Sequence, residues 1–181
     1  MFVKEFCFKG DRGMKSRMMA RCGLFVALMS LCAWIGVGAP VAFTFQTFAV
    51  ALSLLLLGGK WGCVSVCAYL LLGAVGVPVF SSFRGGIGML LGPTGGYLWG
   101  FLITALVYWL ITATMKKTFA PILGLVLGLI GLYTVGTAWY AIFFGAGWIG
   151  ILSTCVAPFV LPDLGKLLLA LSLYKRLQQY T

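Results

Sequence analysis

The chain is divided into long apolar blocks, and the short segments between them carry most of its lysines and arginines. Of its 181 residues, 62% are hydrophobic and 9% are charged, whereas a soluble domain carries roughly a quarter charged residues. Such a chain cannot present a polar surface to water on all sides. Because a helical span takes about 20 apolar residues, the length allows about six helices in one compact all-α membrane domain.

The apolar blocks predict six transmembrane helices. They lie at about residues 18–38, 47–57, 61–77, 93 or 97 to 115, 120–144 and 162–174. Residues 78–97 hold six glycines and two prolines, so neither a helix nor a regular strand is expected there. We expect residues 1–17 to form a basic N-terminal segment and residues 18–181 to form the membrane domain.

The charges predict how this domain sits in the cell membrane. Six spans place the basic N-terminus on one side of the bilayer, together with Lys60, Lys116, Lys117, Lys175 and Arg176. The opposite side receives residues 38–46, 78–93 and 145–162, whose only charged residue is Arg84. The positive-inside rule then places both termini in the cytoplasm. The net charge of +10 therefore indicates topology in a lipid bilayer and not a nucleic-acid partner.

Several kinds of chemistry are not expected. The chain has no histidine, and its six cysteines form no C-x-x-C pair, so neither a metal site nor a redox role is predicted. The glycine-rich segment lacks the Gly-Lys-Ser/Thr ending of a phosphate-binding loop. No cofactor and no enzymatic activity are expected. An intramembrane enzyme is the weakest hypothesis, because only one acidic residue lies within the apolar blocks.

That acidic residue belongs to the segment Pro162-Asp163-Leu164-Gly165-Lys166. Asp163 and Lys166 are three residues apart and share one face of a helix, and Pro162 is suited to be the first residue of that helix. An acid and a base in an apolar helix indicate a functional site. The alternative is a local ion pair that neutralises itself where the helix begins.

The segments on the predicted outer side suggest a binding pocket. Arg84, Asp163 and Lys166 sum to a charge of +1, which suits a small molecule bearing one carboxylate. The aromatic candidates for its walls are Phe43, Phe80, Tyr97, Trp139 and Tyr140. For each of these, the alternative is a place in the aromatic belt at the membrane surface.

Small residues on two helices predict close packing. Ala20, Gly23 and Ala27 share a face of the first helix, and Gly124, Gly128 and Gly131 lie in the fifth. Such faces let another helix approach closely. For the first helix, the partner is either an external protein or a neighbour inside the bundle.

Four motifs in this order resemble the BioY family, the biotin-specific S-components of energy-coupling-factor (ECF) transporters. They are Pro40…Phe43-Thr44-Phe45-Gln46-Thr47, Gly73-Ala74-Val75-Gly76-Val77-Pro78-Val79-Phe80, Gly92-Pro93-Thr94-Gly95-Gly96-Tyr97 and Pro162-Asp163-Leu164-Gly165-Lys166. The resemblance covers the chain from about residue 20. It implies six membrane helices that capture biotin from outside, with a transmembrane coupling protein and two ATPases as partners. The alternative is a solitary biotin facilitator that works without ATPases.

The resemblance also implies roles for single residues. Asp163 would accept from the ureido N–H groups of biotin, and Arg84 or Lys166 would attract its carboxylate. The other ligand-binding candidates are Thr44, Gln46, Phe80, Tyr97 and Tyr140. Ala20, Gly23 and Ala27 would dock on the coupling protein. The chain departs from the family pattern at Ala42, where a second proline is frequent, and at Gly23, in a motif usually written with alanines.

Overall fold

The structure is a computed structural model that describes residues 12–37, 43–145 and 156–179. Its elements are α1 (Arg12–Trp34), β1 (Gly36–Val37), β2 (Phe43–Thr44), α2 (Gln46–Val75), the 3₁₀ helix η1 (Ser81–Phe83), α3 (Ile87–Leu91), α4 (Gly95–Thr114), α5 (Ala120–Phe144) and α7 (Ala157–Gln178). Among the described helices, α1, α2, α4 and α5 are long and apolar enough to cross a membrane. The chain is therefore an all-α, multi-pass membrane protein, apart from a two-strand ladder in which Gly36 pairs with Thr44 and Val37 with Phe43.

Helix α2 has two arms. Gly58 adopts φ 78° and ψ 168° inside it, so the helix bends there between residues 46–57 and residues 59–75. Only glycine adopts such a backbone conformation without steric cost. The second and third predicted helices are thus the two arms of α2. Counting the arms separately, α1, α2, α4, α5 and α7 provide six long helical segments in the described part of the chain.

Three expectations about local structure are wrong. Helix α7 begins at Ala157 and not at Pro162, which lies inside it. Pro158 takes the first-turn position, where a missing N–H leaves no helical bond unmade, and Pro162 follows one turn later. Residues 78–97 were expected to lack helices, yet they contain η1 and α3, whereas the start of α4 at Gly95 lies between the two starts predicted for the fourth span. Helix α1 also starts earlier than expected, at Arg12.

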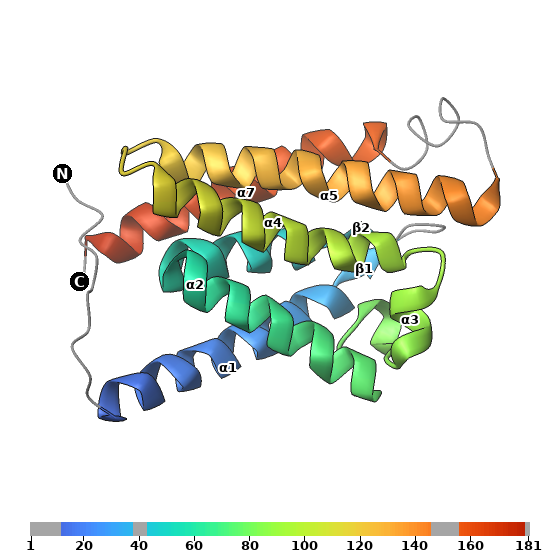
Figure 1. Cartoon of the computed structure of the whole chain (residues 1–181), viewed down its shortest axis with the longest axis horizontal. Coiled ribbons are helices and arrows are strands. Elements are labelled where there is room, and N and C mark those ends of the chain that lie inside the picture. Colours follow the sequence, from blue (N-terminus) through green and yellow to red (C-terminus); the bar gives the residue numbers. More distant parts are fainter. Residues whose placement is uncertain (1–11, 38–42, 146–155, 180–181) are drawn as a thin grey trace.

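The two ends of the bundle differ in charge. In Figure 1, α1, the second arm of α2 and α5 run from left to right, and the first arm of α2, α4 and α7 run back. The right-hand end carries β1, β2 and α3. Most basic residues of the described chain, though not Arg84 and Lys166, gather at the other end, at the start of α1, at the bend of α2, between α4 and α5, and in the last turn of α7. They are Lys15, Arg17, Arg21, Lys60, Lys116, Lys117, Lys175 and Arg176.

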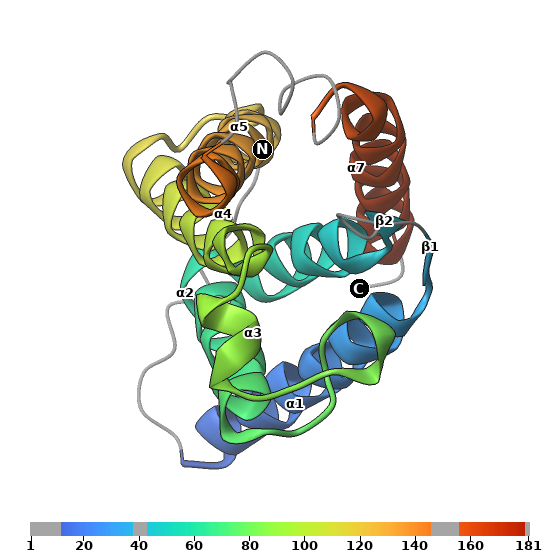
Figure 2. The ribbon, with the colours of Figure 1, turned by 90° about the vertical axis from the view of Figure 1, so that its right-hand side faces the viewer.

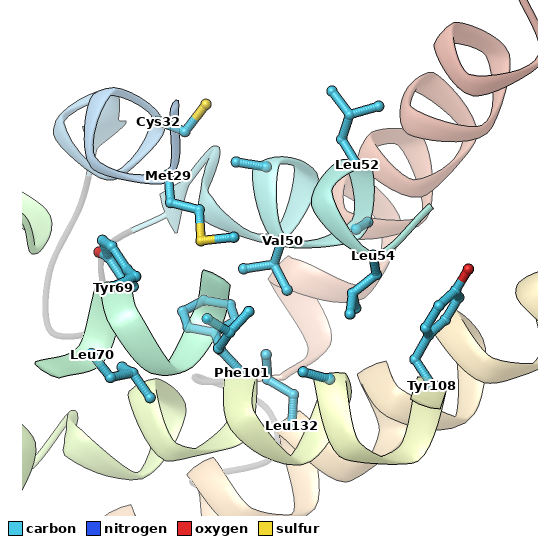
Figure 3. Packing of buried hydrophobic residues seen from close by; sticks show 14 of the residues in the cluster. Met29, Cys32, Val50, Leu52, Leu54, Tyr69, Leu70, Phe101, Tyr108 and Leu132 are labelled. Atoms are coloured by element: carbon cyan, nitrogen blue, oxygen red, sulfur yellow. The ribbon is translucent and has the colours of Figure 1, made fainter. Parts of the chain in front are cut away.

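The first arm of α2 forms the centre of the fold. Nine of the twelve residues from Gln46 to Leu57 are buried, as expected for a helix that is surrounded by other elements. Figure 2 shows this arm between α1 on one side and α7 on the other, with α4 and α5 as a separate pair. Met29 of α1 and Val50 of this arm point toward one another in the core (Figure 3), and Phe101 of α4 belongs to the same cluster.

Glycines allow α4 and α5 to pack at close range, as the sequence predicts. Gly124 lies against Tyr108, and Gly128 lies against Thr104. The hydroxyl of Thr104 donates to the Gly128 carbonyl at 2.9 Å and to the carbonyl of Gly100, in its own helix, at the same distance. This hydrogen bond between helices requires a close backbone approach, which a larger residue would prevent.

Substituting Gly128 by alanine should destabilise the bundle. A Cβ atom there would lie 2.8 Å from Cγ2 and 3.1 Å from Cα of Thr104, and such overpacking costs about 1–3 kcal/mol. Gly23→Ala is the matched control, because no atom lies within 4 Å of that Cβ position. Both variants gain the same helix propensity, so the difference between their unfolding temperatures in detergent reports the packing. Equal unfolding temperatures would contradict this account of α4 and α5.

Candidate functional site

A cavity of about 490 Å³ opens at the end of the bundle that carries β2, η1 and α3. Its walls come from the start of α2, η1, α3, α4, α5 and α7. The cavity brings together all eight ligand-binding residues predicted from the sequence. They are Thr44, Gln46, Phe80, Arg84, Tyr97, Tyr140, Asp163 and Lys166.

The acid and the base of α7 form a buried ion pair. The Lys166 ammonium lies 2.7 Å from Oδ1 of Asp163, and the two residues are 5% and 4% exposed. The ammonium also donates to the Thr44 carbonyl at 2.6 Å and lies 3.8 Å from the centre of the Phe43 ring. Burying a charge in an apolar domain is costly unless it is paired. Lys166 meets that requirement through a carboxylate, a carbonyl and an aromatic face.

Tyr133 is a site residue that the sequence analysis missed. Its hydroxyl donates to Oδ2 of Asp163 at 2.6 Å, so each carboxylate oxygen accepts one hydrogen bond. This bond connects α5 with α7. Tyr133 is seven residues from Tyr140, so the two share one face of α5, and both line the cavity. That spacing is the signal by which the sequence could have indicated it.

A second polar network fixes the side chain of Gln46. Its amide nitrogen donates to the Tyr69 hydroxyl at 2.6 Å, and that hydroxyl donates to the Val79 carbonyl at 2.9 Å. The Thr44 hydroxyl donates to the oxygen of the Gln46 amide at 3.2 Å. These four residues belong to β2, to both arms of α2 and to the segment after it. The network therefore holds the amide of Gln46 in one orientation at the cavity wall.

Phe80 forms a fully buried part of the wall. It packs edge-on against Tyr69, with ring centres 5.6 Å apart, and its ring occupies the space where a Cβ atom on Gly73 would lie. Gly73 therefore has to be glycine for Phe80 to reach this position. The motif that contains both residues thus corresponds to a direct contact in the fold.

Arg84 is placed at the cavity by an unusual loop. The residue is exposed, and its backbone carbonyl accepts from the Phe80 N–H at 2.9 Å. The two residues that directly precede it, Ser82 and Phe83, have φ angles of 58° and 56°. Such left-handed conformations cost on the order of 1 kcal/mol or more for residues other than glycine. The surrounding contacts must therefore hold this loop in place.

The predicted aromatic residues divide into two groups. Phe80, Tyr97 and Tyr140 line the cavity. Phe43 does not line the cavity, and its ring instead lies against the Lys166 ammonium. The indole N–H of Trp139 donates to the Gly92 carbonyl at 3.0 Å, and this residue does not line the cavity. Further apolar wall residues, which the sequence analysis did not single out, are Met89, Leu98, Phe101, Leu132, Phe144 and Phe159.

The electrostatics of the cavity follow from this arrangement. Asp163 and Lys166 neutralise one another, which leaves the charge of Arg84 uncompensated among the described wall residues. Asp163 and Tyr133 retain lone pairs that can accept from N–H donors. The cavity can therefore hold a small molecule with N–H donors at one end, an apolar body and a carboxylate at the other end. No group of three potential metal ligands occurs in the described part of the chain.

The small residues of α1 lie elsewhere. Ala20, Gly23 and Ala27 are all exposed along one face of the helix. No neighbouring atom lies within 4 Å of a Cβ position on Gly23. In the described structure this face is not packed inside the bundle, so internal packing is not its role here.

Comparisons with known proteins agree on one family. A family model described as "BioY family" matches residues 8–181. The biotin transporter BioY of Thermotoga maritima is 42% identical over 165 residues, covering 90% of this chain and 96% of that protein. A probable biotin transporter BioY of Pyrococcus horikoshii is 40% identical over 169 residues, covering 93% of this chain and all of that protein.

A solved structure has the same fold. It is the crystal structure of the S-component for biotin from an ECF-type ABC transporter, with a TM-score of 0.83 and 25% identity. The match covers 94% of this chain and 95% of that one. The S component of another bacterial ECF transporter, with a TM-score of 0.62 and 14% identity, shares the fold alone.

Proposed function

Because the chain belongs to the BioY family, we propose that it captures biotin from outside the cell and imports it as the S-component of an ECF transporter. The observation that carries this proposal is the cavity, in which an acid, an uncompensated cation and aromatic walls lie together. Biotin has matching parts: a ureido group with two N–H donors, an apolar bicyclic body and a carboxylate on a flexible tail. The protein is a transporter component and not an enzyme.

We infer that the ureido group binds at the deep, neutral cluster of Asp163, Lys166 and Tyr133. The carboxylate of Asp163 accepts from one or both ureido N–H groups, and the Tyr133 hydroxyl oxygen can accept as well. Thr44 and Gln46 lie beside this cluster, since the Thr44 carbonyl contacts Lys166. The bicyclic body then lies against Phe80, Tyr97 and Tyr140.

The carboxylate of biotin is assigned to Arg84. The sequence alone left Arg84 and Lys166 as alternatives. Lys166 already contacts Asp163, the Thr44 carbonyl and the Phe43 ring, which favours Arg84. Arg84 is exposed, so it can meet a flexible, charged tail without a large desolvation cost.

The charges at the two ends of the bundle support an orientation in the membrane, and the exposed small residues of α1 support a partner. The basic end faces the cytoplasm, with residues 1–17 as a basic cytoplasmic segment, and the cavity faces outside across the cell membrane. The exposed face of Ala20, Gly23 and Ala27 docks on the transmembrane coupling protein, whose two ATPase subunits supply the energy for import.

The ligand assignment is tested with biotin and with biotin amide, whose tail is uncharged. Asp163→Asn exchanges an acceptor with two oxygens for one oxygen and two donors. It should weaken both ligands by about 1.5–3 kcal/mol, roughly ten- to a hundredfold. Arg84→Gln should weaken biotin by roughly tenfold and leave biotin amide unchanged. Equilibrium binding to the purified protein in detergent measures all four values. An equal loss of both ligands in Arg84→Gln would refute the carboxylate assignment.

The orientation is tested by cysteine labelling in a cysteine-free background. Ser82 is exposed and lines the cavity, so Ser82→Cys should react with an impermeant maleimide from outside, and biotin should slow this reaction. Lys117→Cys, exposed at the opposite end of the bundle, should react only after the membrane is opened. The reverse pattern would show that the orientation is inverted.

The docking face is tested by bulky substitutions. Ala27→Trp should separate α1 from a partner helix, so co-purification with the coupling protein and tagged ATPases should fail while biotin binding by the isolated protein persists. Ile142→Trp is the control, because Ile142 is 83% exposed on a different helix, α5. Loss of biotin binding together with assembly would indicate an effect on the fold. Absence of co-purification even for the unchanged protein would favour a solitary facilitator.

A further inference from the structure

Trp34, the last residue of α1, contacts the loop that carries Arg84, although it does not line the cavity itself. Its indole N–H donates to the Pro78 carbonyl at 2.9 Å. Its ring stacks on Phe83, with ring centres 4.7 Å apart and planes 27° apart. One side chain thus contacts both the beginning of the loop and the residue directly before Arg84.

The loop needs such a contact, because its own backbone is in an unfavourable conformation. Ser82 and Phe83 are consecutive left-handed residues, and neither is glycine. Local hydrogen bonds hold the ends of the loop: the Phe80 N–H donates to the Arg84 carbonyl at 2.9 Å, and the Gly86 N–H donates to the Gly73 carbonyl at 2.7 Å. Phe83 lies between these bonds and is 64% exposed, and its ring stacks on Trp34.

The guanidinium of Arg84 depends on this loop for its position. Within the described residues, no hydrogen bond or ion pair involves its side chain, and the residue is exposed. Its direction is therefore set by its backbone, which follows directly after Phe83. If the Trp34–Phe83 stack were lost, Ser82 and Phe83 could relax to the right-handed or extended region, and the side chain of Arg84 would turn away from the cavity.

We propose that Trp34 is a positioning residue that acts through Arg84 and thereby sets the affinity of the site for the carboxylate end of its ligand. This inference rests on the proposed function, in which Arg84 receives the carboxylate of biotin. Among the described residues, the hydrogen bond and the ring stack of Trp34 both go to this loop, so its effect should be confined to ligands with a charged tail.

The test measures the affinity of Trp34→Ala for biotin and for biotin amide. We expect biotin to weaken by roughly five- to twentyfold and biotin amide to stay within about twofold, since a stacked aromatic pair and one hydrogen bond are lost. Trp34→Phe keeps a ring for stacking and loses only the N–H donor, so a smaller loss of roughly threefold is expected, again for biotin only. In the Arg84→Gln background, Trp34→Ala should cause no further loss.

Trp99 provides the matched control. Its indole N–H donates to the Leu90 carbonyl at 3.2 Å, so Trp99→Ala removes the same kind of bond from α3 and not from the Arg84 loop. It should not discriminate between the two ligands. Unfolding temperatures of all variants identify any that are misfolded, and Trp34→Phe decides the matter if Trp34→Ala is unstable.

The outcomes separate this inference from the proposed function. If Arg84→Gln discriminates between biotin and biotin amide but neither Trp34 variant does, the role of Trp34 is refuted and the proposed function stands. An additive loss in the double variant would also refute it, because Trp34 would then act independently of Arg84. If Arg84→Gln itself fails to discriminate between biotin and biotin amide, the carboxylate assignment is refuted. The role of Trp34 is then refuted as well, because it depends on that assignment.

Discussion

The site depends on the pairing of two charges inside an apolar bundle. Asp163 and Lys166 are both almost fully buried, and either charge alone would be strongly destabilising there. The pair also draws in groups from other elements. The Thr44 carbonyl of β2 accepts from Lys166, and the Tyr133 hydroxyl of α5 donates to Asp163. The requirement to satisfy two buried charges thus connects α7 with α5 and with the segment before α2.

The rest of the cavity is built on rigid contacts around this pair. Gly73 lets Phe80 pack into the core. Hydrogen bonds from Gln46 to Tyr69 and from Tyr69 to Val79 fix the Gln46 side-chain amide at the wall. Arg84 differs from these groups, since it is exposed on a loop with left-handed residues. The cavity therefore combines a buried, neutral cluster with a cation at its open end, and this division is the basis for assigning opposite ends of biotin to them.

Helix α1 has two separate surfaces in this arrangement. Ala20, Gly23 and Ala27 face away from the bundle, while Met29 points into the core and Trp34 reaches the Arg84 loop. Because small residues project little beyond the backbone, the outward face can accept another helix without disturbing the inward one. Binding of a partner and binding of a ligand can thus be tested by separate substitutions in one helix.

The sequence by itself determined the class of fold and the number of long helical segments, and it singled out Asp163 and Lys166 as a pair on one helix face. Apolar block length, charge placement and the i, i+3 spacing of Asp163 and Lys166 are local properties, and each survives folding unchanged. The resemblance of four motifs added the family, which the comparisons confirmed. Only the tertiary structure decided that α7 starts before Pro162, that Tyr133 completes the Asp163 cluster, that Lys166 also bonds the Thr44 carbonyl and that Trp34 contacts the Arg84 loop. Apart from the start of α7, these features are contacts between residues 30 or more positions apart, and no local pattern encodes which distant side chain fills a given space.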